Sequence, residues 1–164
     1  MPGRAAGEFE ALGDAIACAA AGCGRLVAIR GSLLPDALSL AEEAGLAVHL
    51  ARGSEAERAV PFGVARQLLL PPLDALEADE RAEVLAGAAR LAAPVLGPVP
   101  RGPRFGSALA VVHGLYWVTA RLADRAPLAL VVADAGWTDE PSRRLLRYLA
   151  QRIEEQPVAL VVAA

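Results

Sequence analysis

The residues that could do chemistry in this chain are few, and they lie on separate segments. Asp134 follows the apolar run Leu128–Ala133, His113 lies in a long apolar helical pattern, and His49 lies in a short apolar run. A carboxylate and two imidazoles suit acid–base work, but they also suit hydrogen bonding inside a core or a turn. For both histidines, a hydrogen-bonding role inside the core is favoured over a catalytic one. For Asp134, ligand binding and capping of the next turn are equally favoured. If the protein is an enzyme, these three residues are its candidate acids and bases.

A second candidate site is the stretch LVAIRGSLLPDALSL, from Leu26 to Leu40. Its apolar strand pattern leads into Gly31 and then into a helical pattern. Phosphate-binding loops have this form, because glycine amides and a helix N-terminus hold the anion. Gly31 and Ser32 would be the remnant of such a loop. All sixteen basic residues are arginine, so no lysine is available to hold a phosphate or to act as a base.

The two cysteines, Cys18 and Cys23, stand five residues apart at the end of the first helical pattern. Without a histidine or a second cysteine pair nearby, this spacing is weak as a metal site. We expect two small, partly buried apolar side chains rather than a redox or metal centre. The sequence predicts no metal and no cofactor.

Length and composition limit the class of protein. A chain of 164 residues predicts one domain, residues 1–164. The net charge of −3 gives no basic footprint, so we expect no binding to nucleic acid. No apolar run approaches the ~18 residues of a membrane span, and the first residues lack the apolar core of a signal peptide. We therefore expect a cytoplasmic protein that does not contact a membrane.

Four apolar runs alternate with helical patterns. Continuous apolar runs are typical of parallel strands that are buried on both faces. We therefore expect a three-layer α/β fold with a four-stranded parallel sheet. The expected strands are Leu26–Ile29, Leu46–Ala51, Leu128–Ala133 and Val158–Ala163. The expected helices are Phe9–Ala21, a segment from Pro35 closed by Gly45, a short segment broken by Pro71 and Pro72, Glu80–Ala93 capped by Asp79, Ala108–Arg125, and Asp139–Glu154 capped by Thr138.

Nearly the whole chain carries a family likeness. The segments that carry it are GRAAGEFEALGDAI, GRLVAIRG, AVHLARGSEAERAVPFGVARQLLLPPL, and the block from HGLYWV through ADAGWTDEPSRRLL to VALVVAA. Together they resemble the N-terminal ATPase region of large ATP-binding regulators of the LuxR type, within the AAA/STAND group of P-loop proteins. The resemblance implies a truncated P-loop NTPase-like fold with strand order 1-4-3-2.

The departures from this family fall on its catalytic positions. Gly31 keeps the first loop glycine, but the lysine and the Mg²⁺-binding hydroxyl of Walker A have no counterpart. In Walker B, Ala133 stands where the family has its metal-binding acid, and Asp134 keeps only the second acid. Since phosphoryl transfer depends on positioned charges, the resemblance implies that ATP is not hydrolysed.

The function expected is that of a pseudo-ATPase domain in a regulatory role, which binds a protein partner or a small ligand. One alternative is a small enzyme of secondary metabolism that uses Asp134, His113 or His49 in the old nucleotide pocket. Another is an inactive fragment of a LuxR-type regulator. The family's fifth strand is missing beside Leu26–Ile29, which leaves an apolar sheet edge. We therefore expect a homo-oligomer, most simply a dimer.

Overall fold

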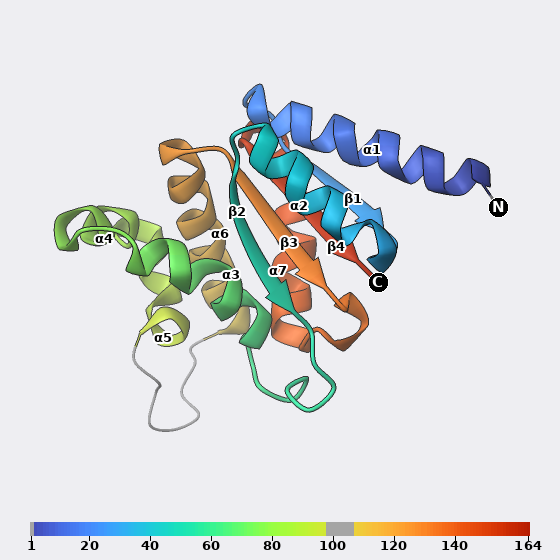
Figure 1. Ribbon diagram of the computed structural model, residues 1–164. Helices are drawn as coiled ribbons and strands as arrows, with labels where there is room; N and C mark the ends of the chain where they lie inside the picture. Colours follow the sequence, from blue (N-terminus) through green and yellow to red (C-terminus); the bar gives the residue numbers. More distant parts are fainter. Residues whose placement is uncertain (1, 98–106) are drawn as a thin grey trace.

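The structure, a computed structural model, describes residues 2–97 and 107–164. A single four-stranded sheet forms its centre (Figure 1). The strand order is β1-β4-β3-β2 and every neighbouring pair is parallel, which confirms the expected α/β sheet and its order. The strands are β1 (Arg25–Ile29), β2 (Ala47–Arg52), β3 (Leu128–Ala133) and β4 (Val158–Ala163).

Helices cover both faces of the sheet (Figure 1). Along β4, Val158 and Leu160 belong to the core under one helical layer, whereas Ala159 and Val161 belong to the core under the other. A strand buried on both faces has no polar side to show in its sequence, which is why the run is continuously apolar. One layer consists of α1 (Pro2–Ala20) and α2 (Leu34–Glu43), and the other includes α3 (Gly63–Asp74), α6 (Ala108–Arg125) and α7 (Glu140–Ala150). No described helix is long and apolar enough to cross a bilayer.

Helix α3 continues through Pro71 and Pro72, so the expected break is wrong. A proline cannot donate to the preceding turn, but its carbonyl still accepts, and Ala75 N donates to Pro71 O at 3.1 Å. Leu73 lies in this last turn and is fully buried. Its burial offsets the amide bonds that the prolines remove.

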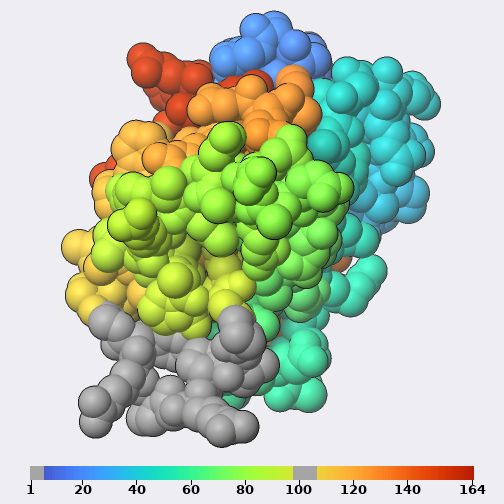
Figure 2. All heavy atoms as spheres, turned by 90° about the vertical axis from the view of Figure 1, so that its left-hand side faces the viewer, coloured from blue at the N-terminus to red at the C-terminus, as the bar shows by residue number. Residues whose placement is uncertain are grey.

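The helix expected over Glu80–Ala93 is divided into three short pieces. These are α4 (Ala78–Val84), the 3-10 segment η2 (Gly87–Ala92) and α5 (Ala93–Leu96). Figure 2 views this side of the molecule, where the green and yellow-green atoms of α3 to α5 form the middle of the visible surface. Helix α4 is capped by Glu77 through a capping box with Glu80, and not by Asp79. At its other end Arg121 of α6 donates to the Ala86 carbonyl at 2.6 Å, which ties the interruption to the core.

Cys18 and Cys23 form a disulfide, so the expectation of two separate apolar side chains is wrong. Helix α1 ends in a Schellman motif, with Cys23 N donating to Cys18 O at 2.9 Å and Gly22 N donating to Ala19 O at 3.1 Å. Gly22 takes the left-handed conformation, φ 99°, that this motif needs. The motif normally brings together two apolar side chains at the positions that the cysteines occupy here. The helix ending therefore creates the contact that the disulfide uses.

Candidate functional site

The loop after β1 is the segment that the sequence predicts to be a remnant phosphate loop, and the amides of Gly31, Leu33 and Leu34 are already hydrogen-bonded within the protein. Gly31 N donates to Ala164 O at 3.0 Å, and Leu33 N donates to Arg30 O at 2.9 Å. The next amide, of Leu34, donates to Gly31 O, because residues Gly31–Leu33 form a 3-10 turn (η1) that leads directly into α2. These amides point at backbone carbonyls and not at an open cradle. Ser32 is exposed on this turn.

A carboxylate from α1 lies beside the same loop. Glu8 Oε2 accepts a hydrogen bond from Arg30 N at 3.3 Å and pairs with Arg30 Nε at 3.1 Å. The Arg30 amide is therefore bound by an acid of the protein itself. A phosphate at this loop would have to compete with the Glu8 carboxylate for the amide and the guanidinium of Arg30.

Asp134 lies at the carboxyl end of β3, as the sequence indicated. Its backbone is left-handed, φ 50°, and its carbonyl accepts from Trp137 N at 2.9 Å, so it opens the turn that follows the strand. The exposed carboxylate pairs with Arg52 at the end of β2. Arg52 is itself held by Gln67, which accepts from Arg52 N at 2.9 Å and donates to Arg52 O at 3.2 Å. Asp134 thus links the ends of two neighbouring strands.

His113 is bound through both ring nitrogens on the α6–α7 seam. Trp117 Nε1 donates to His113 Nε2 at 3.1 Å, and His113 Nδ1 lies 2.7 Å from the Tyr148 hydroxyl oxygen. Since an indole can only donate, Nε2 must accept and Nδ1 carries the proton. The ring is half-buried and joins two helices.

His49 lies in the middle of β2, opposite Leu130 of β3. None of the described hydrogen bonds or ion pairs joins His49, His113 and Asp134 to one another. The three candidate acid–base residues therefore stand on separate elements with separate partners.

Burial lowers the pKa of His49, because desolvation penalises the imidazolium. The unfolded chain then binds more protons at this site than the folded chain does just below the ordinary histidine pKa of about 6.5. Stability should therefore fall as the pH drops through that value and should be retained above it. We expect His49→Gln to flatten the pH dependence of the melting temperature between about pH 7.5 and about pH 5.5. An unchanged slope in this variant would show that His49 does not contribute.

Sequence reasoning missed Asp139, which is 2% exposed. Its Oδ1 accepts from Phe62 N at 2.8 Å and from Ser142 N at 2.9 Å, and its Oδ2 accepts from Val64 N at 3.1 Å. One carboxylate therefore caps the N-termini of both α3 and α7. The expected cap, Thr138, is wrong: its buried hydroxyl has no hydrogen-bond partner among the described residues. The sequence does contain a signal for the cap of α7: an Asp stands directly before the Glu-Pro-Ser with which the helix begins, three residues before the Ser.

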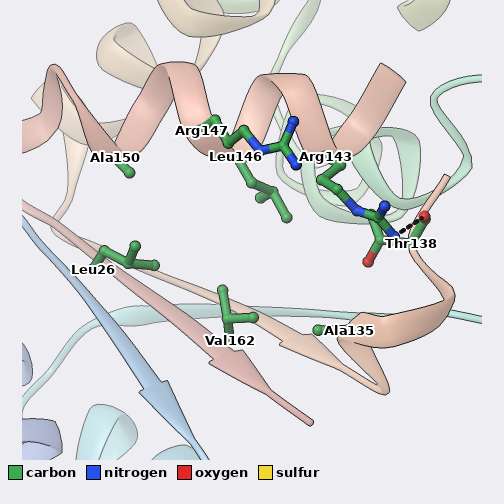
Figure 3. A pocket seen from close by; sticks show the side chains of 8 residues that line it. All are labelled: Leu26, Ala135, Thr138, Arg143, Leu146, Arg147, Ala150 and Val162. Atoms are coloured by element: carbon green, nitrogen blue, oxygen red, sulfur yellow. Dashed lines mark hydrogen bonds between the residues drawn. The ribbon is translucent and has the colours of Figure 1, made fainter. Parts of the chain in front are cut away.

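An apolar groove of about 240 Å³ lies between α7 and the β1–β4 side of the sheet (Figure 3). Leu26 and Val162 form its floor and Leu146 points toward them from α7. Arg143 and Arg147 line it as well, and Arg143 donates to the Thr138 carbonyl at 3.1 Å. The groove offers apolar surface beside fixed positive charge.

Comparison with protein-family models, with curated proteins and with solved structures finds no match to this chain. Within residues 2–97 and 107–164, no cluster of three or more His, Cys, Asp or Glu side chains is arranged to hold a metal ion.

Proposed function

We propose that this protein is a non-hydrolysing binding domain built on a P-loop NTPase-like scaffold of the LuxR-regulator type. In this proposal it acts in a regulatory role by binding a protein partner or a small ligand. The observation that carries the proposal is the state of the loop after β1. The amides of Gly31, Leu33 and Arg30 are bound by Ala164 O, by Arg30 O and by the carboxylate of Glu8, respectively.

The energetic argument concerns what a phosphate would have to displace. A phosphate cradle works because several unbound amides converge on the anion. Here the amides of Gly31, Leu33 and Leu34 would each first have to break an internal hydrogen bond, and a typical bond of this kind contributes about 0.5–1.5 kcal/mol to stability. No lysine compensates, because the chain has none. The net gain from binding phosphates is therefore small or negative.

The arrangement of acid–base groups favours binding over catalysis. A general base must lie within hydrogen-bond reach of the proton it takes, together with the group that assists it. Asp134 and His113 instead bind Arg52 and Tyr148 respectively, on different elements. A repurposed enzyme would need them to meet around one substrate.

The proposed location is the cytoplasm. The Cys18–Cys23 disulfide is the observation that argues against it, because such bonds persist mainly in oxidising compartments.

The experiment is an assay of phosphate release from ATP with Mg²⁺, on the wild type and on Asp134→Asn. We expect no release above the uncatalysed background for either protein, because the metal-binding acid and the lysine are missing. Turnover by the wild type that disappears in Asp134→Asn would refute the proposal.

A further inference from the structure

Strand β1 is an edge of the sheet whose outer side meets no other strand in the described part of the chain. It pairs with β4 alone. Its burial alternates, with Val27 and Ile29 buried under α1, whereas Leu26 is 49% exposed and Ala28 is exposed on the opposite face. An edge with exposed apolar side chains is a template for pairing.

The hydrogen bonds at the end of β1 show which backbone groups face outward. Ala164 N donates to Ile29 O at 3.2 Å and Gly31 N donates to Ala164 O at 3.0 Å, so Ile29 and Gly31 turn their groups toward β4. The direction of the backbone N–H and C=O groups alternates from one residue to the next along a strand. The backbone groups of residues 26, 28 and 30 therefore point away from β4, to the outer side of the sheet. The hydrogen bond from Arg30 N to Glu8 is consistent with this direction, because Glu8 accepts it on the outer side of β1. The outer edge thus presents the N–H and C=O groups of Leu26 and Ala28.

We propose that β1 pairs with β1 of a second copy of this chain, antiparallel and centred on Val27. Leu26 then stands opposite Ala28 of the second copy, and these two residues exchange both hydrogen bonds. By symmetry Ala28 does the same with Leu26 of the second copy. All four outward groups of each copy gain a partner, and the result is a continuous eight-stranded sheet with two-fold symmetry. The inference does not depend on the proposed function, because it uses the sheet edge and not the loop.

Side-chain size fits this register. Ala28 lies beside Val162 of β4, and Leu26 of the second copy would lie on the other side of Ala28 in the same row. Val162 and Leu26 line the groove of Figure 3, and the leucine from the second copy would extend this apolar surface past Ala28. A large residue opposite a small one fills the space between the two strands without a clash, in keeping with the close packing of protein interiors.

Charge favours a second copy as the occupant. Arg25 is exposed and none of the described ion pairs includes it. In the proposed register it stands opposite Ile29 of the second copy, one residue from the amide that Glu8 of the second copy binds. Arg25 thus approaches that carboxylate, and no charged side chain lies between Arg25 and Arg30 to prevent the pairing.

Light scattering at micromolar concentration tests the association. We expect twice the single-chain mass of 17.0 kDa for the wild type. Ala28→Pro removes an outward N–H without touching the β4 ladder, and Leu26→Lys places a charge at the interface, so both should give the single-chain mass. Leu50 of β2, the other edge, is 41% exposed, and Leu50→Lys should keep the double mass. Circular dichroism melts check that each variant folds.

A cross-link tests the register. In a Cys18→Ser, Cys23→Ser background, Val27→Cys should form a disulfide between copies on oxidation, because non-hydrogen-bonded antiparallel partners have Cα atoms about 4.5 Å apart. Ile29→Cys, which faces Arg25 of the second copy, should not cross-link to itself. The inference is overturned by a wild type of single-chain mass, by a double mass that survives both β1 substitutions in folded protein, or by cross-linking at position 29 in place of position 27.

Discussion

Replacing Asp139 with alanine should lower the free energy of unfolding by about 3–5 kcal/mol. The substitution leaves three backbone amides, those of Phe62, Val64 and Ser142, without their acceptor. It also removes the N-caps of α3 and α7 together, in a site that water does not reach. Urea unfolding followed by circular dichroism measures the change.

Two variants serve as controls for this prediction. Asp139→Asn keeps one carbonyl oxygen and should lose less than the alanine variant. Asp134→Ala removes an acid only five residues away, but its ion pair with Arg52 is exposed, so the loss should stay within about 1 kcal/mol. Equal losses of unfolding free energy on alanine substitution at positions 134 and 139 would show that Asp139 does not stabilise the protein as a double cap.

The same substitution at two helical glycines should have opposite signs. At Gly114, inside α6, a Cβ would lie 2.7 Å from the carbonyl carbon of Leu91 and closer still to Ala92 N. Overpacking of this kind costs about 1–3 kcal/mol, and the blocking atoms are backbone, so we expect Gly114→Ala to lose about 2–3 kcal/mol. At Gly13, inside α1, nothing lies within 4 Å of the new Cβ.

Gly13→Ala should therefore raise the free energy of unfolding by up to about 1 kcal/mol, the difference in helix propensity between the two residues. Chemical denaturation of both variants beside the wild type gives the two signs. A Gly114→Ala variant as stable as the wild type would mean that η2 can move away from α6.

The strands were predictable because a strand that is buried on both faces is a continuous apolar run in the sequence. The run Val158–Ala163 matches β4 residue for residue, since both its faces meet apolar layers. Its place between β1 and β3 is a different matter. The strand order was predicted from the family resemblance, because an apolar run does not indicate which strands it pairs with.

The elements that prediction missed depend on contacts distant in the chain. Asp139 accepts from the amides of Phe62 and Val64, which lie 77 and 75 residues away, so its second role, as the cap of α3, has no local pattern. The interruption after α4 likewise depends on Arg121, 35 residues from Ala86. The disulfide is different, because its five-residue spacing around Gly22 is that of a Schellman motif and was readable from the sequence.

The candidate site was only partly predictable for the same reason. Gly31 and the absence of lysine indicated a failed phosphate loop, and the chain order fixed its place after β1. The sequence did not reveal that Glu8 reaches the Arg30 amide across 22 residues. Nor did it show that Asp134 and His113 bind different partners, because side-chain pairing across elements is a property of the packed molecule.

Equilibrium dialysis of labelled ATP with Mg²⁺ against the purified protein tests the central claim most directly, because it measures binding whether or not chemistry follows. The bound internal amides and the carboxylate of Glu8 predict no saturable binding up to about 1 mM nucleotide, equivalent to a binding free energy weaker than about −4 kcal/mol. Saturable binding at lower concentration that inorganic triphosphate displaces would contradict the account, because it would show that the loop after β1 still opens to hold phosphates.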